Sequence, residues 1–224
     1  MSTNSAEPGF RIVPGVLDEA ETSALLHALD AIQLSRSRAG ARHMLKHPAV
    51  AAVAQDPRLL AIAAAFVGPT ATPYRATLFD KSPARNWLVP WHQDTALPLR
   101  KRGDVSGWGP WSIKNGVIYA HAPASALERV IALRLHLDDS LGDNGPLRVL
   151  PGTHALGVLS QSGIDRLVHE IAGVDCLVPA GGVIAMRPLL LHASSKAASE
   201  RPRRVLHIEY ADSMKIEPLD LAIA

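Results

Sequence analysis

Pairs of histidine and carboxylate side chains are the residues of this sequence best suited to chemistry. The 224 residues include 10 histidines, as many as all Phe, Trp and Tyr together, and 21 Asp and Glu. Chance places about one His-x-acid triplet in such a chain. Three occur, namely His92-Gln93-Asp94, His136-Leu137-Asp138 and His207-Ile208-Glu209. Side chains two apart in an extended segment point to the same side, so each triplet offers two ligands to one metal ion. A further histidine would complete the two-histidine, one-carboxylate face of non-haem Fe(II) oxygenases.

The sequence context favours the first triplet. His136-Leu137-Asp138 lies in an alternating run that indicates a polar strand face, which could line the same cavity. His207-Ile208-Glu209 also lies in the middle of an expected strand. His92 and Asp94 follow Trp91 and open a long segment without apolar periodicity. A ligand pair at the end of a strand beside a loop is the better functional location.

The composition limits the class of protein. Hydrophobic residues make up 47% and charged residues 20%, which excludes wholesale disorder. The net charge of +2 is too balanced for a general binder of nucleic acid or membrane surfaces. Cys176 is the single cysteine, so neither an intramolecular disulfide nor a cysteine-based zinc site is available. No apolar run reaches the roughly 18 residues of a membrane span, and residues 1–10 do not read as a signal peptide, so we expect a cytoplasmic protein.

The elements that must position these residues form a helical first third and a strand-rich remainder. Helices are predicted over residues 17–34 with Asp18 as the cap, and over 47–55, 57–67 and 164–172. Extended segments are predicted at 72–80, 115–121, 130–139, 147–150, 183–187 and 203–211, separated by Gly, Pro and Asn turns such as Asn144-Gly145. The pattern predicts an α+β chain whose β part is a sandwich or jelly roll.

The segment from Asp94 to Asn115 is expected to be a long loop. It could be a solvated surface excursion, or a lid whose tryptophans close over a site. Its cations Arg100, Lys101 and Arg102 would suit an anionic small-molecule substrate.

The ordered motifs resemble the phytanoyl-CoA dioxygenase (PhyH-like) family. Pro90-Trp91-His92-Gln93-Asp94 is similar to that family's metal-binding segment. Residues 135–139 and 143–154, with Asn144-Gly145-Pro146-Leu147 and Pro151-Gly152-Thr153-His154, resemble its central strand, turn and strand. His192-Ala193-Ser194, with Arg203 eleven residues after the histidine, resembles its second metal histidine and cosubstrate-binding arginine. The resemblance covers roughly Thr72 to Ala211.

This resemblance implies one PhyH-like domain over residues 1–224, with residues 1–70 as mainly helical support and 71–211 as a double-stranded β-helix (jelly roll, cupin-like) core. It implies an Fe(II)- and 2-oxoglutarate-dependent dioxygenase that uses O2, hydroxylates an aliphatic C–H of a small molecule, and releases succinate and CO2. His92, Asp94 and His192 would be both the catalytic and the metal-binding residues. Arg203 would pair with the far carboxylate of 2-oxoglutarate, and Ser194 would donate a hydroxyl. Because Asp94 fills the position that related halogenases leave empty for halide, hydroxylation is favoured.

The arginine assignment depends on strand alternation. Arg203 and Arg204 are adjacent and point to opposite faces. Arg204 shares its face with apolar residues, whereas Arg203 shares its face with His207 and Glu209, so Arg203 is expected to point into the site. Arg75 and Lys81 are expected to be surface or strand-end charges, with a contact to the cosubstrate as the alternative. Arg134 and His136 are expected to belong to a strand face, with a contact to the cosubstrate or substrate as the alternative.

Two other classes of function remain open at this point. A cupin-like metal-dependent enzyme without 2-oxoglutarate would use the same histidines but would not need Arg203. A catalytically silent relative would bind a ligand or partner without turnover. The oligomeric state and the identity of the substrate do not follow from the sequence.

Overall fold

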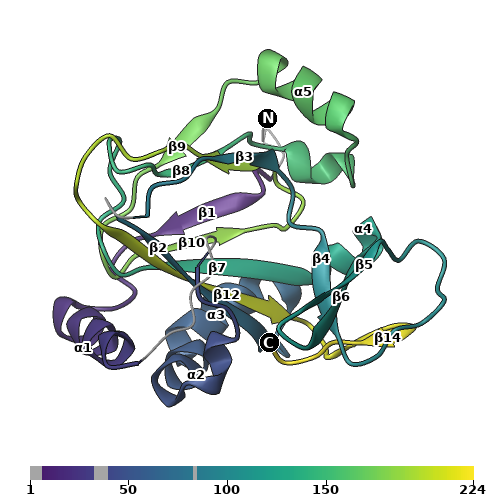
Figure 1. Cartoon of the computed structure of the whole chain (residues 1–224), viewed down its shortest axis with the longest axis horizontal. Coiled ribbons are helices and arrows are strands. Elements are labelled where there is room, and N and C mark those ends of the chain that lie inside the picture. Colours follow the sequence, from purple (N-terminus) through teal and green to yellow (C-terminus); the bar gives the residue numbers. More distant parts are fainter. Residues whose placement is uncertain (1–6, 33–39, 83–84) are drawn as a thin grey trace, which may run out of the picture.

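Two antiparallel sheets form the centre of the protein. A computed structural model describes residues 7–32, 40–82 and 85–224. Its larger sheet has the strand order β1 (Phe10–Val13), β10 (Val183–Met186), β7 (Val130–His136), β12 (Arg203–Ala211) and β2 (Thr72–Lys81). The smaller sheet has the order β3 (Val89–His92), β11 (His192–Ser194), β8 (Leu147–Val149) and β9 (Val174–Cys176). The two sheets lie one above the other in Figure 1, as the layers of a jelly roll do. The jelly roll expected from the sequence is therefore confirmed.

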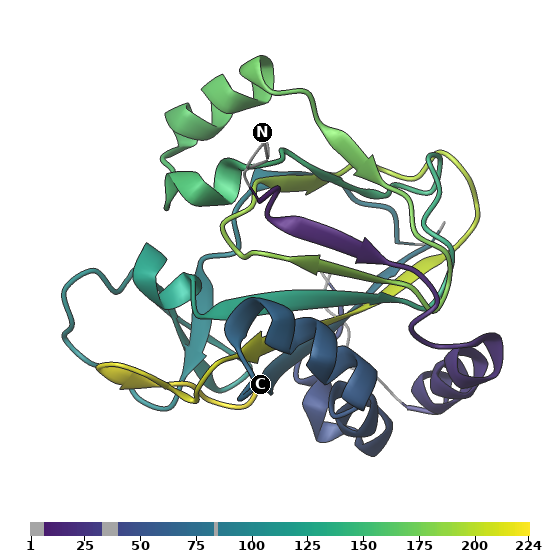
Figure 2. The same ribbon diagram turned by 180° about the vertical axis from the view of Figure 1, so that it is seen from behind.

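Helices cover the outer face of the larger sheet. They are α1 (Glu19–Asp30), α2 (Pro48–Ala54) and α3 (Pro57–Val67). A short 3-10 helix, Met44–Lys46, comes directly before α2. Figure 2 shows α2 and α3 lying against this sheet. Helix α1 begins where the sequence predicts, because Asp18 and Glu21 form a reciprocal capping box with two hydrogen bonds of 2.8 Å. Residues 7–70 also contribute β1 to the sheet, which the sequence analysis did not predict.

Strict alternation along the central strands separates a core from a polar interior. Leu133 and Leu135 of β7 and Leu206 and Ile208 of β12 are fully buried and pack in one hydrophobic cluster with the helices. The intervening residues point between the two sheets. These inward-facing residues include several charged and polar side chains, namely Arg75, Thr77, Lys81, Arg134, His136, Arg203, His207 and Glu209. The larger sheet thus has an apolar outer face and a polar inner face.

The segment expected to be a long loop contains two strands, so that expectation is wrong. Strands β4 (Ala96–Leu99) and β5 (Trp111–Lys114) flank β6 (Val117–His121) in a third sheet. Leu97, Leu99 and Trp108 are buried in a cluster with the short helix α4 (Ala124–Leu127) and the C-terminal hairpin of β13 (Lys215–Ile216) and β14 (Leu219–Asp220). The strand pattern in the sequence was weak because each of these strands is only four residues long, and both pair only within this small sheet.

The remaining helices lie at the periphery. Helix α5 (Gln161–Glu170) and the 3-10 helix Thr153–Leu156 lie over the end of the smaller sheet that carries β3. Among the described residues, no single helix is long and apolar enough to cross a membrane. Helices α2 and α3 pass the length and composition test only as a pair bent by 53°. Their apolar residues Val50, Ala54, Leu59 and Ala63 are fully buried within the protein.

Candidate metal and cosubstrate site

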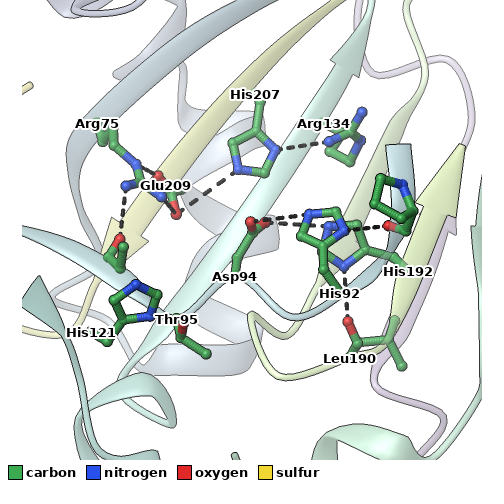
Figure 3. Close-up of polar contacts among 12 residues, drawn as sticks. Arg75, His92, Asp94, Thr95, His121, Arg134, Leu190, His192, His207 and Glu209 are labelled. Carbon is green, nitrogen blue, oxygen red and sulfur yellow. Dashed lines mark hydrogen bonds and ion pairs between the residues drawn. The ribbon is translucent and has the colours of Figure 1, made fainter. Parts of the chain in front are cut away.

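Three side chains that the sequence places far apart converge between the sheets. His92 ends β3, Asp94 follows it by two residues, and His192 begins β11. The two strands pair so that His192 lies opposite His92. One ligand atom from each of His92, Asp94 and His192 lies within 4.8 Å of the others. Figure 3 shows both imidazoles facing the Asp94 carboxylate, with Nε2 to carboxylate oxygen distances of 3.7 Å for His92 and 3.5 Å for His192.

Backbone contacts hold both imidazoles and the segment that carries Asp94 in place. Nδ1 of His92 lies 2.8 Å from the Pro90 carbonyl, and Nδ1 of His192 lies 2.9 Å from the Leu190 carbonyl. A carbonyl only accepts, so Nδ1–H donates in each histidine and Nε2 keeps a lone pair for a metal. Gln93 fixes the segment between the ligands, since its amide donates to the Gly157 and Leu189 carbonyls and accepts from the Leu159 amide.

The charges of the cluster suit a divalent cation. Burial opposes the ionisation of Asp94, yet the neighbouring His192 and His92 hold the pKa of its carboxyl well below the usual range. Burial lowers the pKa of His192 to about 4 against the opposing effect of Asp94. At neutral pH the cluster therefore presents one carboxylate and a neutral buried imidazole, which are the protonation states that metal ligation requires.

A cavity of about 280 Å³ adjoins the cluster and is strongly cationic. Its lining includes His92, Asp94 and His192 together with the four cations Arg42, Lys81, Arg134 and Arg203. Nζ of Lys81 donates to Ser194 Oγ at 2.8 Å, and Nη2 of Arg203 lies 3.3 Å from the same oxygen. Ser194 Oγ in turn donates to the Gly145 carbonyl at 2.8 Å. Ser194 is thus a shared contact of the two cations.

The cations of this cavity lack counter-charges among the described residues. Nη1 of Arg203 and Nε of Arg134 are buried without a hydrogen-bond partner. Burial, reinforced by Arg203 and Arg134, lowers the pKa of Lys81 to about 7, and burial together with Arg134 lowers the pKa of Arg203 to about 9. Unpaired buried cations are costly, so a cavity built this way fits a small dianion that would pair with them.

The structure orients the two neighbouring arginines as alternation predicts. Arg203 is buried and lines the cavity. Arg204 points the other way, where its guanidinium donates twice to Asp138 at 2.8 Å. Asp138 therefore pairs with Arg204 rather than lining the cavity. His136 is buried in β7, and neither of its ring nitrogens has a hydrogen-bond partner among the described residues.

Arg75 and Lys81 are not surface charges, so that part of the expectation is wrong, although Lys81 does lie at the end of β2. Lys81 is 1% exposed and lines the cavity that adjoins the cluster. Arg75 forms an ion pair with the buried Glu209, and Glu209 lies 3.9 Å from His207. His207 then contacts Arg134 at 3.2 Å, so a polar chain runs behind Asp94 (Figure 3). A sequence signal existed, since Arg75, Thr77, Phe79 and Lys81 share one parity on β2, the parity that faces Arg203, His207 and Glu209 of β12.

The tryptophans and cations of the segment from Asp94 to Asn115 do not form a lid over the cluster. Arg100, Lys101 and Arg102 are exposed. They line neither the cavity that adjoins the cluster nor a second cavity that lies beside Asp94. Trp108 is buried in a hydrophobic cluster, and Trp111 packs against the same cluster. Lys114, at the end of β5, is the cation of this segment that reaches a cavity beside Asp94.

A jelly roll whose inner face carries two histidines and one carboxylate has the arrangement of mononuclear non-haem iron oxygenases. Residues 5–205 match the model of the phytanoyl-CoA dioxygenase (PhyH) family. The chain belongs to this family, and the resemblance drawn from the sequence is confirmed.

Individual relatives agree with that membership. The chain is 27% identical over 180 residues to L-proline trans-4-hydroxylase of Streptomyces griseoviridis. That match covers 69% of the chain but 59% of the relative, so the chain spans about three fifths of the length of this enzyme.

Solved structures share the fold at low sequence identity. AviO1 from Streptomyces viridochromogenes Tue57 superposes with a TM-score of 0.67 and 24% identity, covering 97% of this chain and 94% of that one. EctD from S. alaskensis with 2-oxoglutarate and 5-hydroxyectoine superposes with a TM-score of 0.69 and 17% identity, covering 94% of this chain and 76% of that one. HygX from Streptomyces hygroscopicus with nickel and 2-oxoglutarate superposes with a TM-score of 0.63 and 19% identity, covering 92% of this chain and 82% of that one.

Proposed function

We propose that the protein is an Fe(II)- and 2-oxoglutarate-dependent dioxygenase that hydroxylates an aliphatic C–H of a small molecule, with release of succinate and CO2. The observation that carries this proposal is the junction of the His92, Asp94 and His192 cluster with a buried cavity of unpaired cations. Membership of the PhyH family supports it, as do the relative named a hydroxylase and the neighbours that hold nickel or 2-oxoglutarate.

In this proposal His92, Asp94 and His192 hold the iron, which leaves the remaining coordination positions for cosubstrate and O2. Arg203 pairs with the far carboxylate of 2-oxoglutarate, because a guanidinium matches a carboxylate in two-point geometry and stays charged when buried. Lys81 adds an ammonium donor beside it, and the Ser194 hydroxyl would add a second donor by turning from the Gly145 carbonyl, to which it donates in this structure. The bound iron and 2-oxoglutarate would supply the oxidising chemistry, and the chain supplies placement and exclusion of water.

Apolar groups complete the cavity around these donors. Phe79, Trp87, Val89 and Leu147 belong to its lining, and the Trp87 ring lies 5.5 Å from Nζ of Lys81. Such walls strengthen the pairing of buried charges because they exclude water from the cavity. Because Asp94 would occupy the coordination position that a halide needs, hydroxylation remains the proposed reaction.

The test is performed anaerobically with purified protein and Fe(II). We expect 2-oxoglutarate to bind by calorimetry, and succinate to form when O2 and a substrate are added. His92→Ala should abolish metal binding, and Arg203→Ala should weaken 2-oxoglutarate binding by at least about tenfold while metal binding persists. Arg204→Ala is the matched control, since Arg204 pairs with Asp138 outside the cavity.

Three results would contradict the proposal, each in a different way. Metal binding without 2-oxoglutarate binding would indicate a cupin-like enzyme that does not use this cosubstrate. Failure to bind iron at all would indicate a catalytically silent relative. A loss of 2-oxoglutarate binding in Arg204→Ala but not in Arg203→Ala would reverse the arginine assignment.

A further inference from the structure

A second cavity lies beside Asp94, on the side away from the first cavity and its buried cations. It measures about 230 Å³, and Asp94 belongs to the lining of both cavities. Figure 3 shows Arg75, Thr95 and His121 on this side of Asp94, with His92 and His192 on the other. A substrate that is to react beside the metal needs a space that 2-oxoglutarate does not fill. The second cavity offers that space next to the metal cluster.

The lining of this second cavity carries uncompensated positive charge. Its cations are Arg42, Arg75 and Lys114. Glu209 neutralises Arg75, and Asp94 faces the two histidines. Neither Arg42 nor Lys114 forms an ion pair with any residue that the structure describes. Burial, together with Arg42 and Arg75, lowers the pKa of Lys114 against the opposing effect of Asp94, so like charges outweigh the one nearby carboxylate.

Arg42 is positioned by a bridge to the edge of the larger sheet. Ala41 exchanges two backbone hydrogen bonds with Leu78 of β2, at 2.9 and 2.8 Å, and its side chain is buried in the core beneath the helices. Its neighbour Arg42 therefore points to the opposite side, where Thr77 and Phe79 also line the cavity. Gly40 permits this approach, because a Cβ at its φ of +114° would lie 2.3 Å from the Leu78 carbonyl oxygen.

Lys114 is positioned by a tight hairpin. Asn115 and Gly116, with φ of 49° and 80°, reverse the chain between β5 and β6, so Lys114 lies opposite Val117. The ammonium lies 5.0 Å from the centre of the Tyr119 ring, and Tyr119 itself lines the cavity. His121 lies two residues further along β6 and contacts Thr95 Oγ1 at 2.6 Å. The hairpin thus presents one cation and several polar groups to a single space.

We propose that Arg42 and Lys114 bind an anionic group, a carboxylate or a phosphate, of the substrate. This inference rests on the proposed function, since it assigns the second cavity to the substrate and the first to 2-oxoglutarate. The anion pairs with these two cations, which have no ion-pair partner among the described residues, and relieves their mutual repulsion, while the rest of the molecule extends toward Asp94. Arg100, Lys101 and Arg102, which the sequence offered for this role, lie outside both cavities.

The test measures anion binding without turnover. Protein saturated with Ni(II) and 2-oxoglutarate is titrated with acetate, inorganic phosphate and neutral acetamide by calorimetry. We expect acetate or phosphate to bind and acetamide not to bind, and the stronger of the two anions identifies the preferred group. Lys114→Gln and Arg42→Gln should each weaken anion binding about tenfold, whereas Lys114→Arg should retain it. Lys215→Gln, an exposed lysine on β13, is the matched control.

Anion binding that is equal in wild type, Lys114→Gln and Arg42→Gln would overturn the inference, because the anion would then bind at the metal or elsewhere. Equal binding of acetamide and acetate would overturn it too. Failure of the proposed function is distinguishable in the same experiment. If 2-oxoglutarate does not bind but phosphate binding still depends on Lys114, the anion site stands and the cosubstrate assignment fails. Lys114→Gln is the decisive variant, since Arg42 also lines the first cavity.

Discussion

At the scale of single residues, burial lowers the pKa of His192, Lys81 and Arg203 alike, but the consequence differs for each. Burial keeps His192 neutral and able to ligate a metal. The same burial leaves Lys81 easily deprotonated, because its contacts are a hydroxyl and the Ser195 carbonyl rather than a carboxylate. Arg203 stays charged at neutral pH even though its pKa falls to about 9. The proposed cosubstrate cavity thus combines the guanidinium groups of Arg42, Arg134 and Arg203 with one cation, Lys81, that titrates near neutral pH.

The pKa of Lys81 predicts how 2-oxoglutarate affinity depends on pH. In the unliganded protein this pKa is about 7, and a bound dianion would raise it. Affinity should therefore be constant below about pH 7 and fall above it, by up to about tenfold per pH unit, until the raised pKa is passed. Calorimetric titration of 2-oxoglutarate between pH 6 and 9 measures this fall.

Two variants of Lys81 separate its titration from that of other groups. Lys81→Met should bind 2-oxoglutarate more weakly at pH 6 and should lack the fall at higher pH. Lys81→Arg keeps its charge throughout and should show no fall either. A pH dependence in Lys81→Met that matches the wild type would show that Lys81 does not hold the cosubstrate.

At the scale of elements, the turn before β8 supports the site as much as the strands do. Gly145 adopts a φ of +72°, as the Asn-Gly signal predicted, and its carbonyl accepts from Ser194. Asn144 holds the turn closed, since its side chain accepts from Leu141 N and donates to the Asp139 carbonyl. The Asn144 carbonyl in turn lies 3.4 Å from Nε of Arg203. The turn thus connects β7 to the donors of the first cavity.

Substitution of Gly145 should damage that cavity selectively. A Cβ would lie 2.5 Å from the Ser195 carbonyl oxygen and 3.0 Å from Nζ of Lys81. Because the positive φ adds strain, Gly145→Ala should cost about 1–3 kcal/mol of unfolding free energy. It should also weaken 2-oxoglutarate binding by at least about tenfold, since it displaces Lys81 and the end of β11. Chemical denaturation and calorimetry measure the two effects.

Gly142 provides the control for this substitution. It lies three residues earlier, and a Cβ there would meet no atom within 4 Å. Gly142→Ala should leave 2-oxoglutarate affinity unchanged. If Gly145→Ala binds both metal and 2-oxoglutarate as tightly as Gly142→Ala does, the turn is not part of the cosubstrate site.

At the scale of the whole molecule, the proposed metal-binding cluster of His92, Asp94 and His192 connects parts of the chain that are distant in sequence. His92 and His192 are joined through the pairing of β3 and β11, and Asp94 N donates to the Pro188 carbonyl at 2.9 Å. Unfolding separates these groups, so an ion bound by all three residues binds the folded state alone. Occupancy of the cluster should therefore stabilise the entire fold.

Thermal unfolding with and without metal tests this linkage. Ni(II) at 100 times its dissociation constant should add about 2.7 kcal/mol of stability. For a chain of this length the melting temperature should rise by about 5–10 °C. His92→Ala should remove the rise, whereas His169→Ala, on the exposed side of α5, should keep it. An equal rise in both variants would locate the metal outside the cluster.

Much of the fold could be predicted because local signals and tertiary environment agree. Strand β12 begins at Arg203 and ends at Ala211 as predicted, since the apolar Leu206, Ile208 and Tyr210 alternate there with the polar His207 and Glu209. The capped start of α1 and the proline start of α3 were equally clear. Strands β4 and β5 were missed because their stability comes from β6 and from the C-terminal hairpin rather than from their own four residues.

The sequence by itself determined the family, the jelly-roll class, the candidate ligands His92, Asp94 and His192, and the choice of Arg203 on parity. These follow from residue type, order and spacing, which need no knowledge of distant neighbours. Only the tertiary structure decided that Lys81 and Arg134 share a buried cavity with Arg203, and that Arg42 and Lys114 face a second cavity across Asp94. The physical reason is that a charge becomes functional through the burial and the partners that other strands give it, and strand pairing between distant segments sets both.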